Sequence, residues 1–113
     1  MMSMTEKIVR QQLEAYNAHD IPTYVATFSP DIELYELPGQ QPVLTGEMAL
    51  RDYYTDRFER YPNLWARITR QLLIGDFVIC HEELYGLLAE QVVPIVAIYQ
   101  VQNNLIRRIW FIR

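Results

Sequence analysis

The part of the chain that begins at Leu64 consists of four strand-like runs joined by short turns. The runs read LWARITRQLLI, FVICHEELYGLL, VVPIVAIYQVQ and LIRRIWFIR, with turn residues at 75–76, 89–91 and 103–104. Because short connections between consecutive strands form hairpins, this pattern predicts a single antiparallel sheet. Pro94 cannot donate a ladder hydrogen bond and is expected at an edge or a bulge, and Gly86 is expected at a bulge that curves the sheet.

The residues before Leu64 predict three helices and one strand. Their apolar spacing predicts helices over residues 5–18, over residues 21–28 and from about residue 45 to 61, with a strand over residues 32–37. Ser3 and Glu6 have the spacing of a capping box at the start of the first helix. The predicted fold class is therefore α+β, with helices packed against one sheet.

Length and composition limit what the chain is expected to do. The 113 residues are expected to form one domain, residues 1–113, and the formal net charge of -4 disfavours binding to nucleic acid. The single cysteine, Cys80, cannot form an intrachain disulfide, which predicts a reducing, cytoplasmic location. No apolar run approaches the roughly 18 residues that cross a bilayer, and the N-terminal residues lack an export pattern, so neither membrane insertion nor export is expected.

The strand around residues 95–101 is apolar on both of its alternating faces. One face carries Ile95, Ala97, Tyr99 and Val101, and the other carries Val96 and Ile98. An antiparallel strand with one face in water normally alternates between apolar and polar residues. The helices can cover one face of the sheet, so the pattern predicts a homodimer that packs through the other face.

Four segments resemble a known superfamily. They are YNAHD at residues 16–20, FSPDIELYE at residues 28–36, LTGEMALRDYY at residues 44–54 and VAIYQVQNNLIRRIWFI at residues 96–112. Together with the order of elements, they resemble the nuclear transport factor 2-like superfamily, and within it the SnoaL-like and ketosteroid isomerase-like branch. The resemblance covers about residues 5–113.

This resemblance implies a cone-shaped domain in which a curved antiparallel sheet packs against three helices around an internal cavity. Members of the superfamily include isomerases, cyclases, dehydratases, epoxide hydrolases, trafficking factors and association domains, and many dimerise. The fold therefore implies a cavity and leaves the chemistry open.

Ketosteroid isomerase provides the sharpest comparison of site residues. Its catalytic base lies where the first strand ends, and the resemblance places Glu36 at that position. Its two oxyanion donors are not reproduced, because Gln12 falls where the tyrosine would be and Ala97 where the second acid would be, although Tyr16 lies one helical turn further along. Loss of one such donor can cost roughly a hundredfold in rate, so steroid isomerisation by the same mechanism is not expected. The alternative for Glu36 is a solvent-facing carboxylate at a strand end.

His81 is the second candidate catalytic residue. On its strand it shares a face with Phe77, Ile79 and Glu83, while Glu82 points the opposite way with Val78 and Cys80. A histidine in a cavity could act as an acid or a base near neutral pH. The alternative is a hydrogen-bonded histidine of the core or of the sheet interface.

Aromatic residues are numerous enough to form the wall of a cavity for a flat, apolar ligand. The candidates for substrate binding are Tyr16, Tyr24, Phe28, Tyr54, Phe58, Trp65, Tyr99 and Trp110. The alternative for each is an ordinary place in the core. Arginines at residues 67, 70, 107, 108 and 113 lie on strands, and one that points inward would favour a ligand with a carboxylate.

No cofactor or metal is predicted. The two histidines, His19 and His81, lie on different elements without metal-ligand spacing, and the four glycines form no phosphate-binding loop. We therefore expect a SnoaL-like protein that binds a small apolar carbonyl or hydroxyl compound and has an isomerase, cyclase or dehydratase type of activity. The alternative is a non-catalytic ligand-binding or association module.

Overall fold

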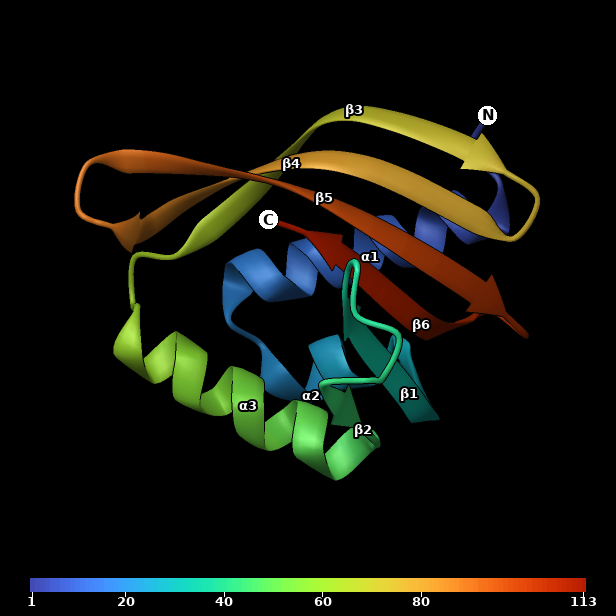
Figure 1. The fold of residues 1–113 in the computed structure, drawn as a ribbon, viewed down its shortest axis with the longest axis horizontal. Coiled ribbons are helices and arrows are strands. Elements are labelled where there is room, and N and C mark those ends of the chain that lie inside the picture. The colour runs from blue at the N-terminus through green and yellow to red at the C-terminus, as the bar shows by residue number, and fades with distance from the viewer.

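A computed structural model describes residues 1–113 as three helices and a six-stranded sheet, which confirms the predicted α+β class. The elements are, in chain order, α1 (Met4–Ala18), α2 (Ile21–Val25), β1 (Phe28–Glu36), β2 (Leu44–Thr45), α3 (Glu47–Arg60), β3 (Trp65–Ile74), β4 (Phe77–Leu88), β5 (Gln91–Gln102) and β6 (Leu105–Ile112). Figure 1 shows the sheet lying across the helices, with α3 at the side opposite to β3.

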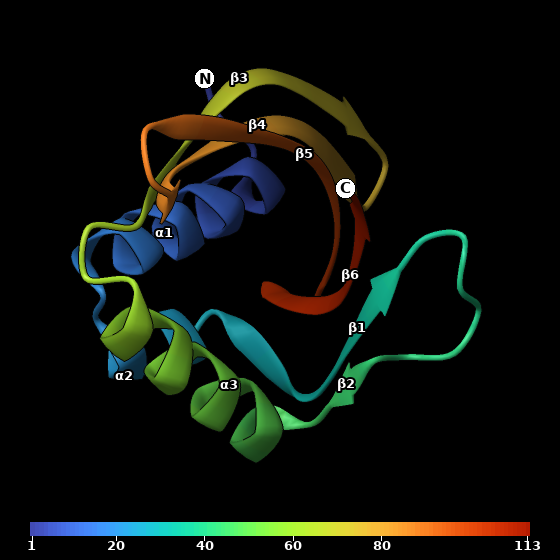
Figure 2. The same cartoon turned by 60° about the vertical axis from the view of Figure 1, so that its left-hand side comes forward.

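The sheet curls around the helices. Its strand order is β2-β1-β6-β5-β4-β3, and Figure 2 shows the strands forming an arc with α1, α2 and α3 on its concave side. The three predicted hairpins are confirmed, because β3 pairs with β4, β4 with β5 and β5 with β6, all antiparallel. The concave side, here called the inner face, is the side on which the core and any cavity must lie.

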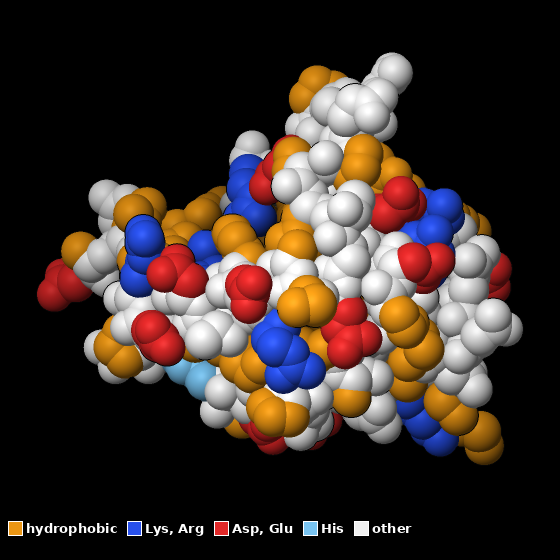
Figure 3. All heavy atoms as spheres, turned by 90° about the horizontal axis from the view of Figure 1, so that it is seen from below, with side chains coloured by type: hydrophobic (Ala, Val, Ile, Leu, Met, Phe, Trp, Pro, Cys, Tyr) orange, Lys and Arg blue, Asp and Glu red, His pale blue; other side chains and the backbone are white.

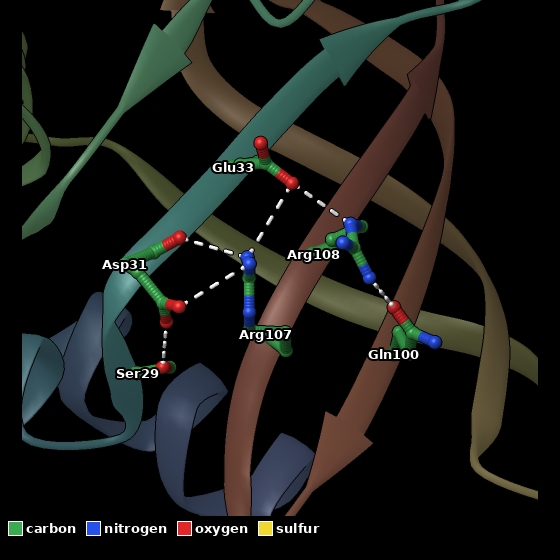
Figure 4. Close-up of polar contacts among 6 residues, drawn as sticks. All are labelled: Ser29, Asp31, Glu33, Gln100, Arg107 and Arg108. Atoms are coloured by element: carbon green, nitrogen blue, oxygen red, sulfur yellow. Dashed lines mark hydrogen bonds and ion pairs between the residues drawn. The ribbon is translucent and has the colours of Figure 1, made fainter.

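One pairing differs from the predicted all-antiparallel sheet. Strand β1 runs parallel to β6, so the sheet is mixed. Figure 4 shows the ion pairs that join the two strands: Arg107 contacts Asp31 at 3.2 Å and Glu33 at 3.4 Å, and Arg108 contacts Glu33 at 2.8 Å. The local turn signals used for the prediction concern only neighbouring strands, and this pair is separated by most of the chain.

The second helix is shorter than predicted. It ends at Val25, and Phe28, expected in the helix, is instead the first residue of β1, where it pairs with Ile106. The amide of Ile106 donates a hydrogen bond of 2.9 Å to the carbonyl of Thr27, and the Thr27 hydroxyl donates one of 2.7 Å to the carbonyl of Tyr24. These bonds end the helix and draw the chain into the sheet before Pro30.

The other helices form as predicted. Ser3 and Glu6 make the reciprocal bonds of a capping box at the start of α1. Helix α3 buries Leu50, Tyr54 and Phe58, the apolar positions expected from its spacing. Figure 3 views the side of the molecule on which α3 lies in Figure 1, and it shows charged and hydrophobic side chains interspersed over that surface.

Both predicted irregularities lie in the β4–β5 hairpin. The register shifts between Leu84 and Leu88, and Gly86 lies within this bulge with a φ of 81°. Pro94 pairs with Glu83 on β4, while the pairing of β5 with β6 begins only at Val96, so Pro94 lies where β5 has one neighbour. The hairpin can therefore curve away from β6 without losing a ladder hydrogen bond at Pro94.

Candidate functional site

A small polar cavity lies between the helices and the inner face of the sheet. It is lined by Gln12, Leu13, Tyr16, Tyr24, Tyr54, Arg57, Ala66, Glu82, Leu84, Ile95, Tyr99, Phe111 and Arg113. The space open to the centres of water-sized molecules is about 20 Å³, which is enough for about one water or one small polar group of a ligand. Residues from α1, α2, α3 and four strands therefore converge on one small space.

Glu82 is the buried acid of this cavity. Along β4 the buried positions alternate as Val78, Cys80, Glu82 and Leu84, so the strand's pleat places Glu82 on the inner face. Its side chain is 4% exposed, and the Tyr99 hydroxyl on the neighbouring strand donates a hydrogen bond of 2.7 Å to its Oε2. Glu82 is the only carboxylic acid in the molecule that is both buried and directed into a cavity.

Burial changes the protonation of this pair. Loss of hydration raises the pKa of Glu82 to about 7, although the Tyr99 hydrogen bond and the positive charge of Arg113 oppose the shift. Burial and the nearby Glu82 together hold the pKa of Tyr99 well above its usual range, so Tyr99 stays a hydrogen-bond donor. Near neutral pH, Glu82 can therefore exist in both its acidic and its basic form.

Gln12 and Arg57 bring polar groups to the opposite wall. Gln12 on α1 is 5% exposed, and its side-chain carbonyl oxygen has no hydrogen-bond partner. Arg57 on α3 is half-buried and close to Tyr16: burial raises the pKa of Tyr16, and the Arg57 charge opposes that shift. The cavity thus offers an acceptor at Gln12 and a cation at Arg57, as well as the Glu82 acid.

A second, larger hollow adjoins the cavity, and we call it the outer groove. It has a volume of about 240 Å³ and is lined by Leu34, Glu36, Val43, Leu44, Tyr53, Tyr54 and Arg113. Tyr54 and Arg113 line both spaces. Glu36 therefore lies in the groove and not in the cavity. In the groove, its Oε1 and Oε2 accept hydrogen bonds of 2.9 and 3.1 Å from Arg113 Nε.

His81 faces away from both spaces. It pairs across strands with Arg70 and Val96, which lie on the outer face, and its ring contacts the hydroxyl of Thr69. The alternation of β4 explains this position, because the residues on either side of the buried Glu82 must point outward. The structure consequently does not bring Glu36 and His81 together, and it does not place His81 in the cavity as we had expected.

The predicted aromatic residues separate into three groups. Tyr16, Tyr24, Tyr54 and Tyr99 line the cavity, while Phe28 and Phe58 are buried against Tyr24 in the core. Trp65 and Trp110 lie on the outer face, where Trp65 stacks on Tyr85 and Trp110 stacks on Tyr35. We had expected both tryptophans in the cavity wall, but the strand register directs them to the other side of the sheet.

Sequence reasoning passed over three of the polar residues at the cavity. Glu82 carried a readable signal, since it shares a strand face with the apolar residues Val78, Cys80 and Leu84, which alternate with the outward positions of the strand. Gln12 was noticed only as a departure from ketosteroid isomerase, and Arg57 had no signal beyond its place on an amphipathic helix. The inward arginine that we considered is Arg113, which lines the cavity, whereas Arg67, Arg107 and Arg108 pair with carboxylates outside it.

Two further observations concern metals and membranes. No group of three or more His, Cys, Asp or Glu side chains is arranged so that it could hold a metal ion. None of the three helices has the length and apolar character required to cross a membrane.

Comparisons with solved structures agree with this architecture. An uncharacterised cystatin-fold protein from Novosphingobium aromaticivorans is 26% identical, with a TM-score of 0.86 and 100% of both chains covered. A Kribbella flavida protein provisionally described as a ketosteroid isomerase is 19% identical, with a TM-score of 0.79, and covers 96% of this chain and 76% of its own. TerC, co-crystallised with polyporic acid, is 13% identical, with a TM-score of 0.76 and coverage of 96% and 90%. The last two are similar in fold alone.

Sequence comparison assigns the family. No curated protein sequence is similar enough to match the chain. A model of the SnoaL-like domain, however, matches residues 9–109. This match and the structural neighbours confirm the superfamily expected from the sequence. Because the matched region includes nearly the whole chain, the protein belongs to the SnoaL-like domain family.

Proposed function

We propose that this protein binds a small, largely apolar carbonyl or hydroxyl compound and transfers a proton within it, with Glu82 as the acid and base. The observation that carries this proposal is the buried Glu82–Tyr99 pair, with its 2.7 Å hydrogen bond and a carboxyl pKa of about 7. A general acid or base works best when its pKa lies near the working pH. The reaction class is that of a cofactor-independent isomerase, cyclase or dehydratase.

The chemistry requires few groups. Ionised Glu82 accepts a proton from the carbon next to a carbonyl group, and protonated Glu82 returns it at another atom of the same molecule. Tyr99 holds the carboxyl group in one orientation throughout. Negative charge that develops on the substrate oxygen is stabilised by a donor in the same cavity, for which the Tyr16 hydroxyl is available.

This arrangement differs from that of ketosteroid isomerase. Ala97, at the position where the resemblance expects the second acid, is fully buried and cannot donate, and Glu36 pairs with Arg113 in the outer groove. We assign Glu36 to positioning Arg113 at the entrance. The acid or base role of His81 stays a prediction from the sequence, and no contact within the cavity supports it.

Two features favour the competing hypothesis of a non-catalytic ligand-binding or association module. The cavity is small, and the outer face of the sheet exposes apolar side chains at Leu72, Ile74 and Ile112.

We further propose that this face forms a homodimer, and that the protein resides in the cytoplasm, where its buried thiol at Cys80 stays reduced. The co-crystallisation of TerC, a protein of similar fold, with polyporic acid supports small-molecule binding in either case.

Exchange of hydrogen for deuterium tests proton transfer without knowledge of the natural substrate. A panel of small cyclic and aryl ketones is incubated with the protein in D₂O, and exchange next to the carbonyl is followed by NMR. For a ketone that exchanges, Glu82→Gln should slow the protein-dependent rate by about a hundredfold or more, the usual contribution of a general base. Glu83→Gln is the matched control, because Glu83 lies on the same strand but faces outward toward Arg67.

Two results would contradict the proposal. Exchange that persists in Glu82→Gln at the unmodified rate would exclude Glu82 as the base. If no ketone of the panel exchanges faster with the unmodified protein than without it, the non-catalytic hypothesis is favoured.

A further inference from the structure

The cavity contains a polar atom that the protein itself does not satisfy. Gln12 is 5% exposed, lines the cavity, and leaves its side-chain carbonyl oxygen without a hydrogen bond. An unpaired buried acceptor is unfavourable in the free protein, so it favours any ligand that brings a donor to it. The group that fits is a hydroxyl, because the space beside it holds about one small polar group.

The cavity also contains a cation without a counter-ion. Six arginines pair with carboxylates: Arg51, Arg60, Arg67, Arg107, Arg108 and Arg113. Arg57 does not, although it is half-buried. It interacts with the Tyr16 hydroxyl, and its guanidinium carbon lies 6.0 Å from the centre of the Tyr61 ring. A partly desolvated guanidinium is a strong and geometrically specific site for a carboxylate.

The outer groove supplies the apolar part of a site. Its wall includes Leu34, Val43, Leu44 and Tyr53, and only the Tyr54 and Arg113 side chains are shared with the cavity. Arg113 is 37% exposed, and such partly exposed ion pairs contribute little to stability. A rotation of Arg113 away from the cavity is therefore inexpensive and would join the two spaces.

We propose that the ligand is a small cyclic hydroxycarboxylate, with its hydroxyl donating to Gln12, its carboxylate on Arg57 and its ring in the outer groove. The cavity alone has room for about one of these polar groups, so binding of this ligand requires that rotation of Arg113 enlarge it toward the groove. This inference deepens the proposed function, because it concerns the same cavity and names the substrate class. Gln12 and Arg57 line the same cavity as Glu82, so a ligand held by both lies in the space that contains the proposed acid.

Three aromatic probes separate the contributions of the two polar groups. They are 3-hydroxybenzoate, benzoate, which lacks the hydroxyl, and 3-hydroxybenzamide, which lacks the charge. Binding to the full chain at neutral pH is measured by calorimetry or NMR titration. We expect 3-hydroxybenzoate to bind about tenfold more tightly than either of the others, since one charge-assisted or buried hydrogen bond is worth about 1.4 kcal/mol or more.

Variants assign each preference to its residue. Arg57→Gln should remove the preference for the carboxylate over the amide, while Arg60→Gln, an exposed arginine on the same helix, should keep it. Gln12→Leu should remove the preference for the hydroxyl, while Gln11→Leu, at the exposed neighbouring position, should keep it. If Arg57→Gln does not fold, Arg57→Lys serves in its place and should weaken, but not abolish, the carboxylate preference.

The outcomes distinguish this inference from the proposed function. Glu82→Gln should keep both binding preferences even if it loses proton transfer, because neither preference depends on the acid. Equal binding of the acid and the amide to the unmodified protein would overturn the inference. So would a carboxylate preference that survives in Arg57→Gln, or no binding of any probe up to about 10 mM, which corresponds to less than roughly 3 kcal/mol.

Discussion

Glu82 illustrates how the pleat of a strand sets the chemistry of one side chain. His81, Glu82 and Glu83 are consecutive, yet Glu82 faces the core while its neighbours face outward. Glu83 pairs with Arg67 and Tyr85 near solvent, and these partners lower its pKa. Glu82 has lost its hydration, and its pKa rises to about 7. The pKa values of two adjacent glutamates are therefore shifted in opposite directions from the ordinary value.

This shift links the folding free energy to pH. The ordinary pKa of Glu82, which applies to the unfolded chain, is 4.5, and the folded-state value is about 7. Between these values the folded protein holds a proton that the unfolded chain has released. The stability contributed by Glu82 is thus fully present below pH 4.5 and is lost as the pH rises through 7. We expect a loss of the order of 3 kcal/mol, which is 1.36 kcal/mol per pKa unit.

The prediction is measured by urea unfolding of the unmodified protein and of Glu82→Gln at pH 5 and pH 8. Glutamine keeps the shape and an acceptor for Tyr99 but does not titrate. The unmodified protein should lose stability relative to the variant as the pH rises. A stability difference between the two proteins that stays constant over this range would show that Glu82 is not held protonated.

At the scale of elements, the β4–β5 bulge depends on one glycine. Gly86 has a φ of 81°, and a Cβ built there would lie 2.2 Å from the carbonyl oxygen of Asn63. Gly86→Ala therefore combines left-handed backbone strain with a clash against the connection between α3 and β3, and should destabilise the fold by about 3 kcal/mol or more. Urea unfolding of the variant measures this loss.

The matched control for this prediction is Gly75→Ala in the β3–β4 turn. Gly75 also has a positive φ, of 57°, but nothing lies within 4 Å of its added Cβ. Only the strain of roughly 1–2 kcal/mol should remain. Equal losses in the two variants would mean that the contact with Asn63 contributes nothing.

The elements also show where sequence reasoning succeeded. The hairpins from β3 to β6 and the spacing of Leu50, Tyr54 and Phe58 on α3 were predictable, because turn residues and helical periodicity are local signals. The parallel pairing of β1 with β6 was not, since its contacts join residues such as Glu33 and Arg108 that are 75 positions apart. The end of α2 was missed for the same reason, because β6 draws Phe28 into the sheet.

For the whole molecule, the existence of a cavity was easier to predict than its residues. The order of the elements implied a sheet that curls around the helices. The alternation of side chains along the strand already placed Glu82 and His81 on opposite faces of the sheet. The sequence does not indicate which face of each strand becomes the inner one, because that depends on the packing of α1 and α3 against the completed sheet. His81 was favoured over Glu82 for this reason, and Glu36 was favoured because the resemblance to ketosteroid isomerase places it at the base position. Gln12 and Arg57 come together with Glu82 only when the helices and the sheet are assembled.

Assembly also leaves the outer face of the sheet without a cover. All three helices lie on the inner side, so Ile79, Val96 and Ile98 in the middle of the outer face are only partly buried by their neighbours. Leu72 and Ile74 at one side of this surface are 54% and 58% exposed. A contiguous apolar surface of this kind is typical of an association site. The helical side, by contrast, mixes charged and hydrophobic groups (Figure 3).

The whole-molecule prediction is that the protein sediments at micromolar concentration with twice the mass of one chain. Ile98→Asp, in the centre of the outer face, should raise the dissociation constant of this dimer by about a hundredfold, because burial of an unpaired charge costs about 3 kcal/mol. Met48→Asp is the control, since Met48 is 79% exposed on α3 and lies on the helical side. Circular dichroism verifies that both variants fold. A monomeric unmodified protein, or an Ile98→Asp variant that dimerises as tightly as the Met48→Asp control, would show that the outer face does not join two copies.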